Sequence, residues 1–213
     1  MTNIKIPDAP NSIQKGIPLK YMLDKEAIQQ LGINLHIVDS GFKKEAFIRG
    51  CLQDIEDLGL KNRAQHIANI MRTYLPQVYS EAIVVLLASL TPVLDGTEGN
   101  GLGGMFYMPH NAYIATYGVD PQYNRGQDPF EVSMQYQHEL TKRFTCEFAI
   151  RPFLAHHPDR TFTRLYQWMN DSDSHVRRLC TEGTRPRLPW AKKLVSLADD
   201  PSPSFPILEN LKE

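Results

Sequence analysis

Hydrophobic residues recur three and four positions apart in two long stretches of the chain, as they do on the buried face of an amphipathic helix. In the first stretch, which ends near Pro92, Ser40 is predicted to cap a helix that stops at Gly59, and the next helix is predicted to end at Pro76. Helical spacing resumes after Pro129. No segment reads clearly as a strand. The pattern therefore predicts an all-α chain.

The second stretch looks repetitive. Helices are predicted over Phe144–Leu154, over Phe162–Met169, from a cap at Asp173 or Ser174 to a stop at Gly183, and from Pro189 to Leu197. Pro152 would bend the first of these helices. Paired helices that repeat every roughly 26 to 31 residues bury their apolar faces only against neighbouring pairs. The spacing predicts a right-handed solenoid of HEAT-like helical repeats.

Two segments depart from this pattern. Residues 1–17 hold two prolines and little periodicity, so a flexible N-terminal arm is predicted, followed by one repeat domain over residues 18–213. Residues 93–129 are rich in glycine and are predicted to be irregular. Within them, residues 99–104 match the Gly-x-Gly-x-x-Gly pattern of dinucleotide-binding sites. A dinucleotide-binding site needs a strand directly before this pattern. Here a predicted helix and a polar turn precede it, so we reject that interpretation.

Composition fits an ordinary globular protein of 213 residues, 42% of them hydrophobic. Its three cysteines lack the spacing of metal ligands or of a disulfide framework, so reduced thiols are expected. No apolar run is long enough for a signal segment or a membrane span. We expect a cytoplasmic, monomeric protein without a metal, a cofactor or a membrane partner.

Positive charge is concentrated in one quarter of the chain. Between Lys142 and Lys193 there are eleven Lys and Arg residues against five Asp and Glu residues, although the whole chain has a formal net charge of −1. The remainder of the chain is therefore acidic. This asymmetry points to an anionic partner for the basic quarter.

Two carboxylates in the basic quarter are candidates for chemistry. Glu147 lies one helical turn before Arg151, and a surface ion pair is the simpler explanation of that spacing. Glu182 lies in the last turn before Gly183, where the helix dipole disfavours a negative charge. Arg178 lies four residues before Glu182, and a basic residue that precedes its acidic partner on a helix gives the weaker ion pair. Glu182 therefore breaks a local rule without local compensation, which marks it as a functional candidate.

Basic side chains flank these carboxylates on three successive segments. Pro186 and Pro189 favour an extended chain from Thr184 to Leu188, which would aim Arg185 and Arg187 to the same side, as suits a phosphate backbone. The preceding helix adds Arg177 and Arg178, and the following segment adds Lys192 and Lys193. A continuous DNA-binding groove is one interpretation. A solvated basic surface is the other.

Both tryptophans of the chain lie in the same quarter. Trp190 follows the arginine segment, and Trp168 falls beside the apolar stripe of its own helix. Either could be a core residue. Together with Glu147 and Glu182 they could instead hold a positively charged group, because aromatic faces and carboxylates both attract cations. A cationic group attached to a polyanion fits this surrounding, and a methylated base in DNA is such a group.

At these residues the sequence resembles the AlkC branch of the AlkC/AlkD alkylpurine DNA glycosylases, which fold as HEAT-like repeats. The resemblance covers most of the chain. Its most specific motifs are Glu147-Phe-Ala-Ile-Arg-Pro-Phe-Leu154 and Glu182-Gly-Thr-Arg-Pro-Arg-Leu-Pro-Trp190. In that family Glu147, Glu182 and Trp190 match positions that serve the active site. The chain ends at Glu213, whereas the family continues through further repeats.

The resemblance implies base excision repair of alkylated double-stranded DNA. The reaction would hydrolyse the N-glycosidic bond of cationic methylated bases such as 3-methyladenine, with Glu147 and Glu182 stabilising the oxocarbenium and positioning water. Trp190 and Trp168 would contact the sugar or base, and the arginines, Arg151 among them, would bind phosphates. One alternative is a non-catalytic helical module that binds DNA or a protein. Another is a protein-binding solenoid indifferent to DNA.

Overall fold

A computed structural model describes residues 4–93 and 101–212. The elements run in the order η1 (Leu19–Leu23), α1 (Lys25–Val38), α2 (Lys44–Leu52), η2 (Ile55–Asp57), α3 (Leu60–Tyr74), α4 (Tyr79–Ala88), η3 (Gly101–Tyr107), α5 (Met108–Tyr117), η4 (Pro121–Asn124), α6 (Phe130–Thr141), α7 (Ile150–His156), α8 (Pro158–Trp168), α9 (Ser174–Gly183), α10 (Val195–Asp199), η5 (Ser202–Ser204) and α11 (Phe205–Asn210). No strand occurs in the described ranges. The predicted all-α class is confirmed.

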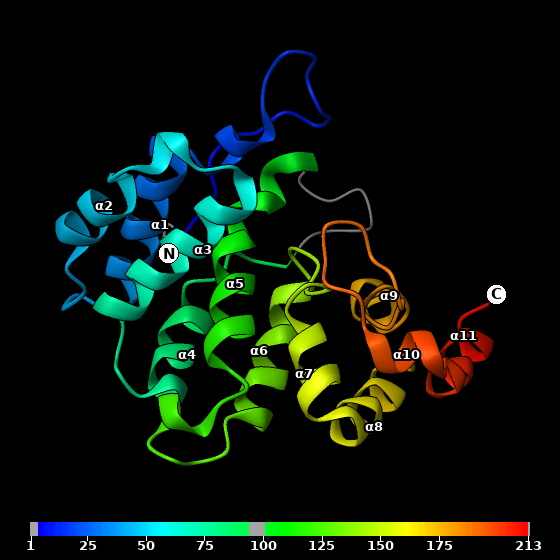
Figure 1. Cartoon of the computed structure of the whole chain (residues 1–213). Coiled ribbons are helices and arrows are strands. Elements are labelled where there is room, and N and C mark those ends of the chain that lie inside the picture. Colours follow the sequence, from blue (N-terminus) through cyan, green and yellow to red (C-terminus); the bar gives the residue numbers. More distant parts are fainter. Residues whose placement is uncertain (1–3, 94–100, 213) are drawn as a thin grey trace.

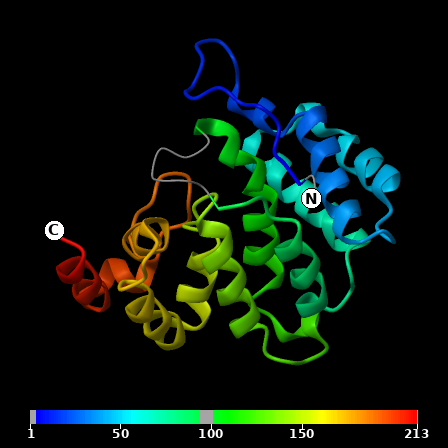
Figure 2. The ribbon, with the colours of Figure 1, turned by 180° about the vertical axis from the view of Figure 1, so that it is seen from behind.

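The helices pack in sequence order from one side of the molecule to the other (Figure 1). Helix α1 packs on α2, α3 on α5, α4 on α6, and α7 on α8, while α8 and α6 both contact α9. Helices α1 and α2 lie on the opposite side of the molecule from helix α11, as the reverse view also shows (Figure 2). One continuous apolar core runs through all these contacts, from Leu23 to Ile207. Among the described residues no helix is long and apolar enough to cross a membrane.

Several helix boundaries follow from residues visible in the sequence. The Asp173 carboxylate accepts hydrogen bonds from the N–H groups of His175 and Val176, so the predicted cap of α9 is confirmed. Helix α3 ends at Tyr74, two residues before Pro76, as predicted. The Asp24 carboxylate caps α1 by accepting from the N–H of Ala27 at 2.9 Å. Side-chain caps therefore define where α1 and α9 begin.

The predicted boundaries of α2 are wrong. This helix starts at Lys44, and Lys43, rather than Ser40, occupies its N-cap position. It also stops at Leu52, because Asp54 adopts a left-handed backbone with a φ of 55°. The apolar residues up to Leu58 continue in the short helix η2 and its C-cap instead.

Helix α5 lies in the segment that was predicted to be irregular. Its buried residues include His110, Asn111, Tyr113 and Ile114, which point to more than one side of the helix. A helix buried on several sides shows no single apolar stripe, so its periodicity is hidden in the sequence. The rejected glycine pattern begins at Gly99, outside the described residues; its later part forms η3.

The segment around Pro152 also differs from its prediction. Helix α7 starts at Ile150, so Pro152 lies in the first turn, where a missing N–H costs no intrahelical hydrogen bond. Glu147 therefore lies in a turn before the helix. The helix predicted from Pro189 is likewise wrong, because residues 184–194 form a loop and α10 begins at Val195.

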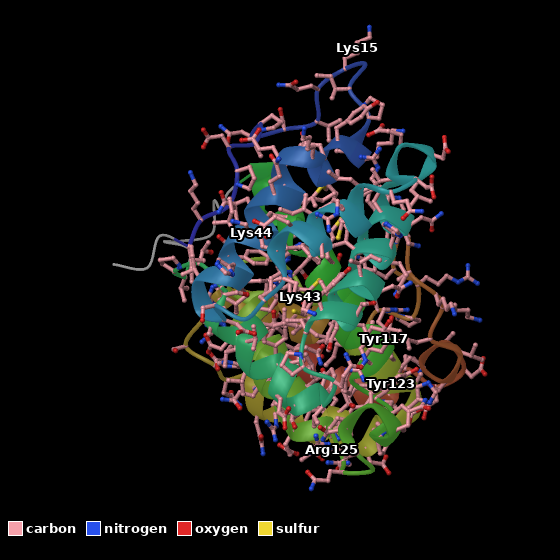
Figure 3. All side chains as sticks on the ribbon, turned by 90° about the vertical axis from the view of Figure 1, so that its left-hand side faces the viewer. Lys15, Lys43, Lys44, Tyr117, Tyr123 and Arg125 are labelled. Atoms are coloured by element: carbon pink, nitrogen blue, oxygen red, sulfur yellow. The ribbon has the colours of Figure 1, made fainter. Side chains whose placement is uncertain are left out.

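The connection from α5 to α6 folds back onto α3. The Tyr117 and Tyr123 rings, both labelled in Figure 3, contact edge to face with 5.0 Å between their centroids. The Arg72 guanidinium of α3 lies over both rings, at 5.7 and 5.4 Å. This cluster ties α3 and α5 together at the end remote from the candidate site. Near the N-terminus, the buried Asn34 side chain donates to the Lys5 carbonyl at 2.7 Å. The flexibility of residues 1–17 and the domain limits stay predictions.

Candidate functional site

Glu147 and Glu182 approach each other from two elements. Glu147 lies half-buried in the turn before α7, and Glu182 lies in the last turn of α9. Burial raises the pKa of Glu147, and the negative charge of Glu182 raises it further, while the charges of Arg178 and Arg185 and a hydrogen bond with the Thr145 side chain oppose the shift. The two carboxylates are thus electrostatically coupled. Because its pKa is raised, Glu147 is a stronger base than an ordinary glutamate.

The local surroundings of Glu182 differ from the expectation. Its carboxylate forms an ion pair with Arg185 at 2.8 Å, three residues further on, just beyond the helix end. The unfavourable dipole position is therefore compensated locally. Arg178 is exposed and contributes charge to the environment of Glu147. Arg185 and Arg178 thus keep the carboxylate pair in a positively charged surrounding.

Arg151 is buried rather than paired with Glu147 on a helix surface. Its side chain is 5% exposed. Its guanidinium donates five hydrogen bonds, of 2.7 to 3.3 Å, to the backbone carbonyls of Gly183, Arg185, Pro186 and Lys192. A guanidinium has five N–H donors, so these bonds use all of them. A phosphate contact by Arg151, as the sequence suggested, would require some of these bonds to break.

Trp190 lies at the tip of the loop formed by residues 184–194. Its side chain is 57% exposed, and its backbone is left-handed with a φ of 66°. This conformation is unfavourable for a bulky residue by about 1–3 kcal/mol and persists only where the surroundings enforce it. The Lys61 ammonium on α3 donates a hydrogen bond to the Trp190 carbonyl at 2.5 Å. The loop tip is therefore held from the N-terminal half of the chain.

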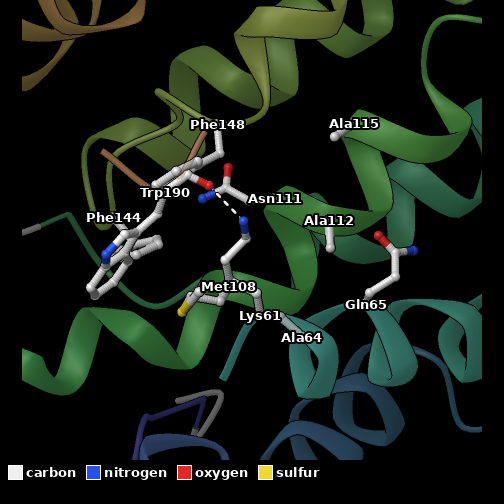
Figure 4. A pocket seen from close by; sticks show the side chains of 10 residues that line it. All are labelled: Lys61, Ala64, Gln65, Met108, Asn111, Ala112, Ala115, Phe144, Phe148 and Trp190. Atoms are coloured by element: carbon white, nitrogen blue, oxygen red, sulfur yellow. Dashed lines mark hydrogen bonds between the residues drawn. The ribbon is translucent and has the colours of Figure 1, made fainter. Parts of the chain in front are cut away.

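The Trp190 indole forms one wall of a cavity of about 130 Å³ (Figure 4). The cavity is lined by Lys61, Ala64, Gln65, Met108, Asn111, Ala112, Ala115, Phe144, Phe148 and Trp190. A neighbouring cavity of about 540 Å³ shares Lys61 and Trp190. Phe144 and Phe148 lie on either side of Glu147 in the sequence, so the cavity borders the turn that carries Glu147, although neither Glu147 nor Glu182 lines the cavity itself.

Asn111 connects the cavity with the carboxylate turn. Its side-chain amide donates to the Thr145 carbonyl at 2.9 Å, and the Thr145 hydroxyl accepts from the N–H of Glu147 at 3.3 Å. Its other side-chain atom, Oδ1, is buried and has no hydrogen-bond partner among the described residues. Helix α5 thus supports the turn on which Glu147 lies.

Trp168 lies apart from Trp190. It is 7% exposed on α8, and its ring lies 5.4 Å from the imidazole of His138 on α6. It does not line the cavity beside Trp190. The core interpretation of Trp168 describes its position, and a contact with substrate stays a prediction.

The remaining predicted basic residues fall into two groups. Arg177 donates to the carbonyls of Asp171 and Ser172, at 2.8 and 2.9 Å, and so supports the turn between α8 and α9. Arg187, Lys192 and Lys193 are exposed on the loop after α9. Exposed cations on one loop are available to an anionic partner, and their binding role stays a prediction.

Sequence reasoning missed Lys61, Asn111, Phe144 and Phe148 as site residues. Phe144 and Phe148 were assigned to a helix core because their spacing is helical. Lys61 gave no signal, since its contact is made across 129 residues of sequence. Asn111 lies in α5, whose periodicity is hidden in the sequence. Its polar side chain is the one feature of that position that could have suggested a site residue.

Comparison with known proteins agrees with the sequence motifs. The structure is similar to that of the Pseudomonas fluorescens alkylpurine DNA glycosylase AlkC bound to DNA containing an abasic site analog. The TM-score is 0.78 at 28% identity, over 92% of this chain and 51% of that one. The predicted resemblance to AlkC is confirmed. The match to AlkC also confirms the predicted helical-repeat fold, and the right-handed sense and HEAT-like type of the repeats stay predictions.

A sequence relative supports the same grouping. The chain is 33% identical to the uncharacterized protein YhaZ of Bacillus subtilis over 196 residues, which is 92% of this chain and 50% of YhaZ. No family model matches the chain. This chain spans about half the length of YhaZ and about half the length of AlkC.

Proposed function

We propose that this chain acts in DNA alkylation repair as a glycosylase that removes cationic methylated bases, such as 3-methyladenine, from double-stranded DNA. The main support is the electrostatically coupled pair Glu147 and Glu182, on a turn whose Phe144 and Phe148 share a cavity with the exposed indole of Trp190, in a chain similar to AlkC over 92% of its length. A cytoplasmic monomer remains our expectation for its state in the cell.

The chemistry needs negative charge and a base close to the sugar. A methylated purine already carries positive charge, so it leaves without further protonation. When the N-glycosidic bond breaks, its electron pair neutralises the base and the deoxyribose becomes an oxocarbenium. Water then adds to C1′, and its proton passes to a general base. Nearby carboxylates stabilise the positively charged sugar in this sequence.

The two carboxylates are suited to different parts of this reaction. Glu182, in its ion pair with Arg185, supplies a fixed negative charge. The raised pKa of Glu147 makes it the better acceptor of the water proton. The exposed indole of Trp190 would contact the sugar or the cationic base. Arg178, Arg187, Lys192 and Lys193 are exposed and would bind phosphates.

The direct test is release of 3-methyladenine from methylated duplex DNA, measured by chromatography with protein in excess over DNA. Glu147→Gln should slow release about 100-fold or more, the usual loss when a general base is removed. Glu131→Gln is the matched control, because Glu131 is exposed and paired with Arg164 away from the site. Release no faster than with heat-inactivated protein would reject the proposal.

A second candidate is a DNA-binding module without catalysis. The basic segment from Lys142 to Lys193 favours it. It predicts affinity that falls steeply with salt but no base release. Arg187→Ala with Lys193→Ala should weaken DNA binding under either function, whereas Arg160→Ala with Arg164→Ala, which removes two cations from an acidic surface, should not. Equal binding by both double variants would count against DNA as the partner.

A further inference from the structure

The loop between α9 and α10 is held closed by its own backbone at two points. After α9 the chain runs outward through Arg185 and Pro186, turns at Trp190, and returns through Lys192 to Leu194. The N–H of Leu194 donates to the Pro186 carbonyl at 3.0 Å, and the N–H of Ala191 donates to the Leu188 carbonyl at 3.1 Å. The outgoing and returning arms therefore lie side by side below the tip.

Arg151 bonds to both arms of this loop from beneath. Three of its acceptors, the carbonyls of Gly183, Arg185 and Pro186, belong to the end of α9 and the outgoing arm. The fourth acceptor, the Lys192 carbonyl, belongs to the returning arm and receives two bonds, at 2.7 and 3.1 Å. A planar guanidinium presents its donors in a rigid fork, so it fixes the relative position of all four carbonyls.

The charge of Arg151 is not neutralised by a direct ion pair in the described part of the chain. Burying an unpaired cation is costly, and the carbonyl dipoles offset this cost only when the hydrogen-bond geometry is well formed. The buried guanidinium therefore destabilises the fold by its desolvation, and it also fixes the geometry of the loop. The loop tip presents the exposed Trp190 indole, next to the aromatic residues that flank Glu147.

We infer that Arg151 is a positioning residue, whose guanidinium closes the loop of residues 184–194 so that Trp190 is already placed at the cavity next to the turn of Glu147 before DNA arrives. Lys61 completes this arrangement from α3 through its hydrogen bond to the Trp190 carbonyl. Preorganisation of this kind keeps catalytic groups in register with the reacting atoms. The consequence for activity depends on the proposed glycosylase function; the closure of the loop does not.

Arg151→Lys is the informative variant, because it keeps the charge but loses the fork. In a Trp168→Phe background, Trp190 is the sole tryptophan and reports loop mobility through fluorescence anisotropy decay and acrylamide quenching. We expect faster local motion and about two-fold stronger quenching in Arg151→Lys, since the indole gains freedom on the nanosecond timescale. Unchanged Trp190 motion in a folded Arg151→Lys protein would overturn the inference.

Activity and binding separate positioning from phosphate contact. Arg151→Lys should lower the single-turnover excision rate about ten-fold or more, as expected for small misplacements in an active site, and leave DNA affinity within about two-fold. If Arg151 contacted a phosphate instead, loss of the two-pronged contact would lower the affinity for all DNA sequences and leave the motion of Trp190 unaffected. That second result would refute the positioning role.

Two further measurements keep the test decisive if Arg151→Lys fails to fold. Lys61→Met removes the anchor on the loop tip without leaving a buried group unpaired, and it should loosen Trp190, whereas Lys44→Met on α2 should not. In the unmodified chain, the Leu194 N–H should exchange with solvent slowly, like the N–H groups of α9. Rapid exchange at Leu194 would show an open loop and overturn the inference even if excision were absent.

Discussion

Two buried arginines, one in each half of the chain, hold backbone carbonyls in place. Arg63 on α3 donates to the carbonyls of Leu58, Leu23 and Lys20 at 3.1, 3.2 and 3.4 Å. It also pairs with the Glu56 carboxylate at 3.1 Å. Arg151 on α7 donates only to carbonyls, that of Gly183 at the end of α9 and those of Arg185, Pro186 and Lys192 in the loop that follows.

The difference lies in what each arginine holds. The acceptors of Arg63 end η1 and precede α3, so Arg63 joins two elements of the core. The acceptors of Arg151 belong to a segment with exposed side chains, including Arg185, which pairs with Glu182, and Trp190 at the loop tip. The same chemistry thus stabilises the fold in one place and shapes a candidate binding surface in the other. Variants made in pairs, one at each arginine, can test this distinction.

The largest expected effect is on global stability. Arg63→Met leaves three carbonyls of the core and the Glu56 carboxylate without their partner, and should lower the free energy of unfolding by about 3–5 kcal/mol. Arg151→Met should cost less, about 2–3 kcal/mol, because the loop can open and let water reach its carbonyls. Urea unfolding followed by circular dichroism measures both. A larger loss at Arg151 than at Arg63 would contradict this division.

Each arginine has a glycine beside its acceptors, and these glycines differ in surroundings. A Cβ on Gly183 would lie 2.6 Å from Cγ2 of Ile150, whereas a Cβ on Gly59 would meet nothing within 4 Å. Gly183→Ala should therefore destabilise the protein by about 1–3 kcal/mol, as overpacking does. Gly59→Ala should change stability by less than about 1 kcal/mol. Similar melting temperatures for both variants would mean that α7 and α9 are less closely packed than the structure shows.

The helices around Arg63 and Arg151 could be predicted from sequence for different reasons. Around α3 the apolar stripe and Pro76 sufficed, because a helix with one buried face shows its period directly. Around Arg151 the motif residues Glu147 and Glu182 could be named as candidates from the sequence. The segment after Gly183 is predicted to be an extended stretch followed by a helix, whereas it forms a loop. Prolines restrict the backbone without specifying which carbonyls a distant side chain will bind.

The features that the sequence did not reveal depend on contacts between distant segments. Lys61 reaches Trp190 across 129 residues, and no local pattern encodes that pairing. The burial of Arg151 depends on carbonyls at positions 183 to 192, which any residue type could supply. Asn111 was hidden by the burial of α5 on several sides. Local rules therefore identified the charged groups, whereas tertiary packing decided which of them face solvent.

Strained backbone provides a smaller contrast between the same two regions. Asp54, in the turn before η2, and Trp190 both adopt a positive φ, of 55° and 66°. Glycine at either position relieves about 1 kcal/mol of strain and costs a similar amount in chain entropy, so both variants should unfold within about 1 kcal/mol of the parent. Only Trp190→Gly should slow base excision. A large loss of stability in Trp190→Gly would make the indole a structural residue.

The smallest expected effect on stability concerns charge in the site. Because burial raises the pKa of Glu147 above its ordinary value of 4.5, the folded state binds a proton more readily than the unfolded state between these two pKa values. Stability therefore falls as pH rises through that window. Glu147→Gln removes this loss, so the variant should be more stable than the parent at pH 7, and the two should converge below about pH 4.

Glu139, outside the site, gives the opposite sign. Partial burial raises its pKa, but the hydrogen bond and charge of Lys142, with a smaller contribution from His138, outweigh burial and hold the pKa below 4.5. Its ionised form stabilises the fold above pH 4.5, and this stability is lost as pH falls through the lowered pKa. Glu139→Gln should therefore destabilise the protein at pH 7. If Glu147→Gln also destabilised the protein at pH 7, Glu147 would be a structural carboxylate like Glu139. The two regions would then not differ in the way that the two arginines indicate, because the main catalytic candidate would itself stabilise the fold.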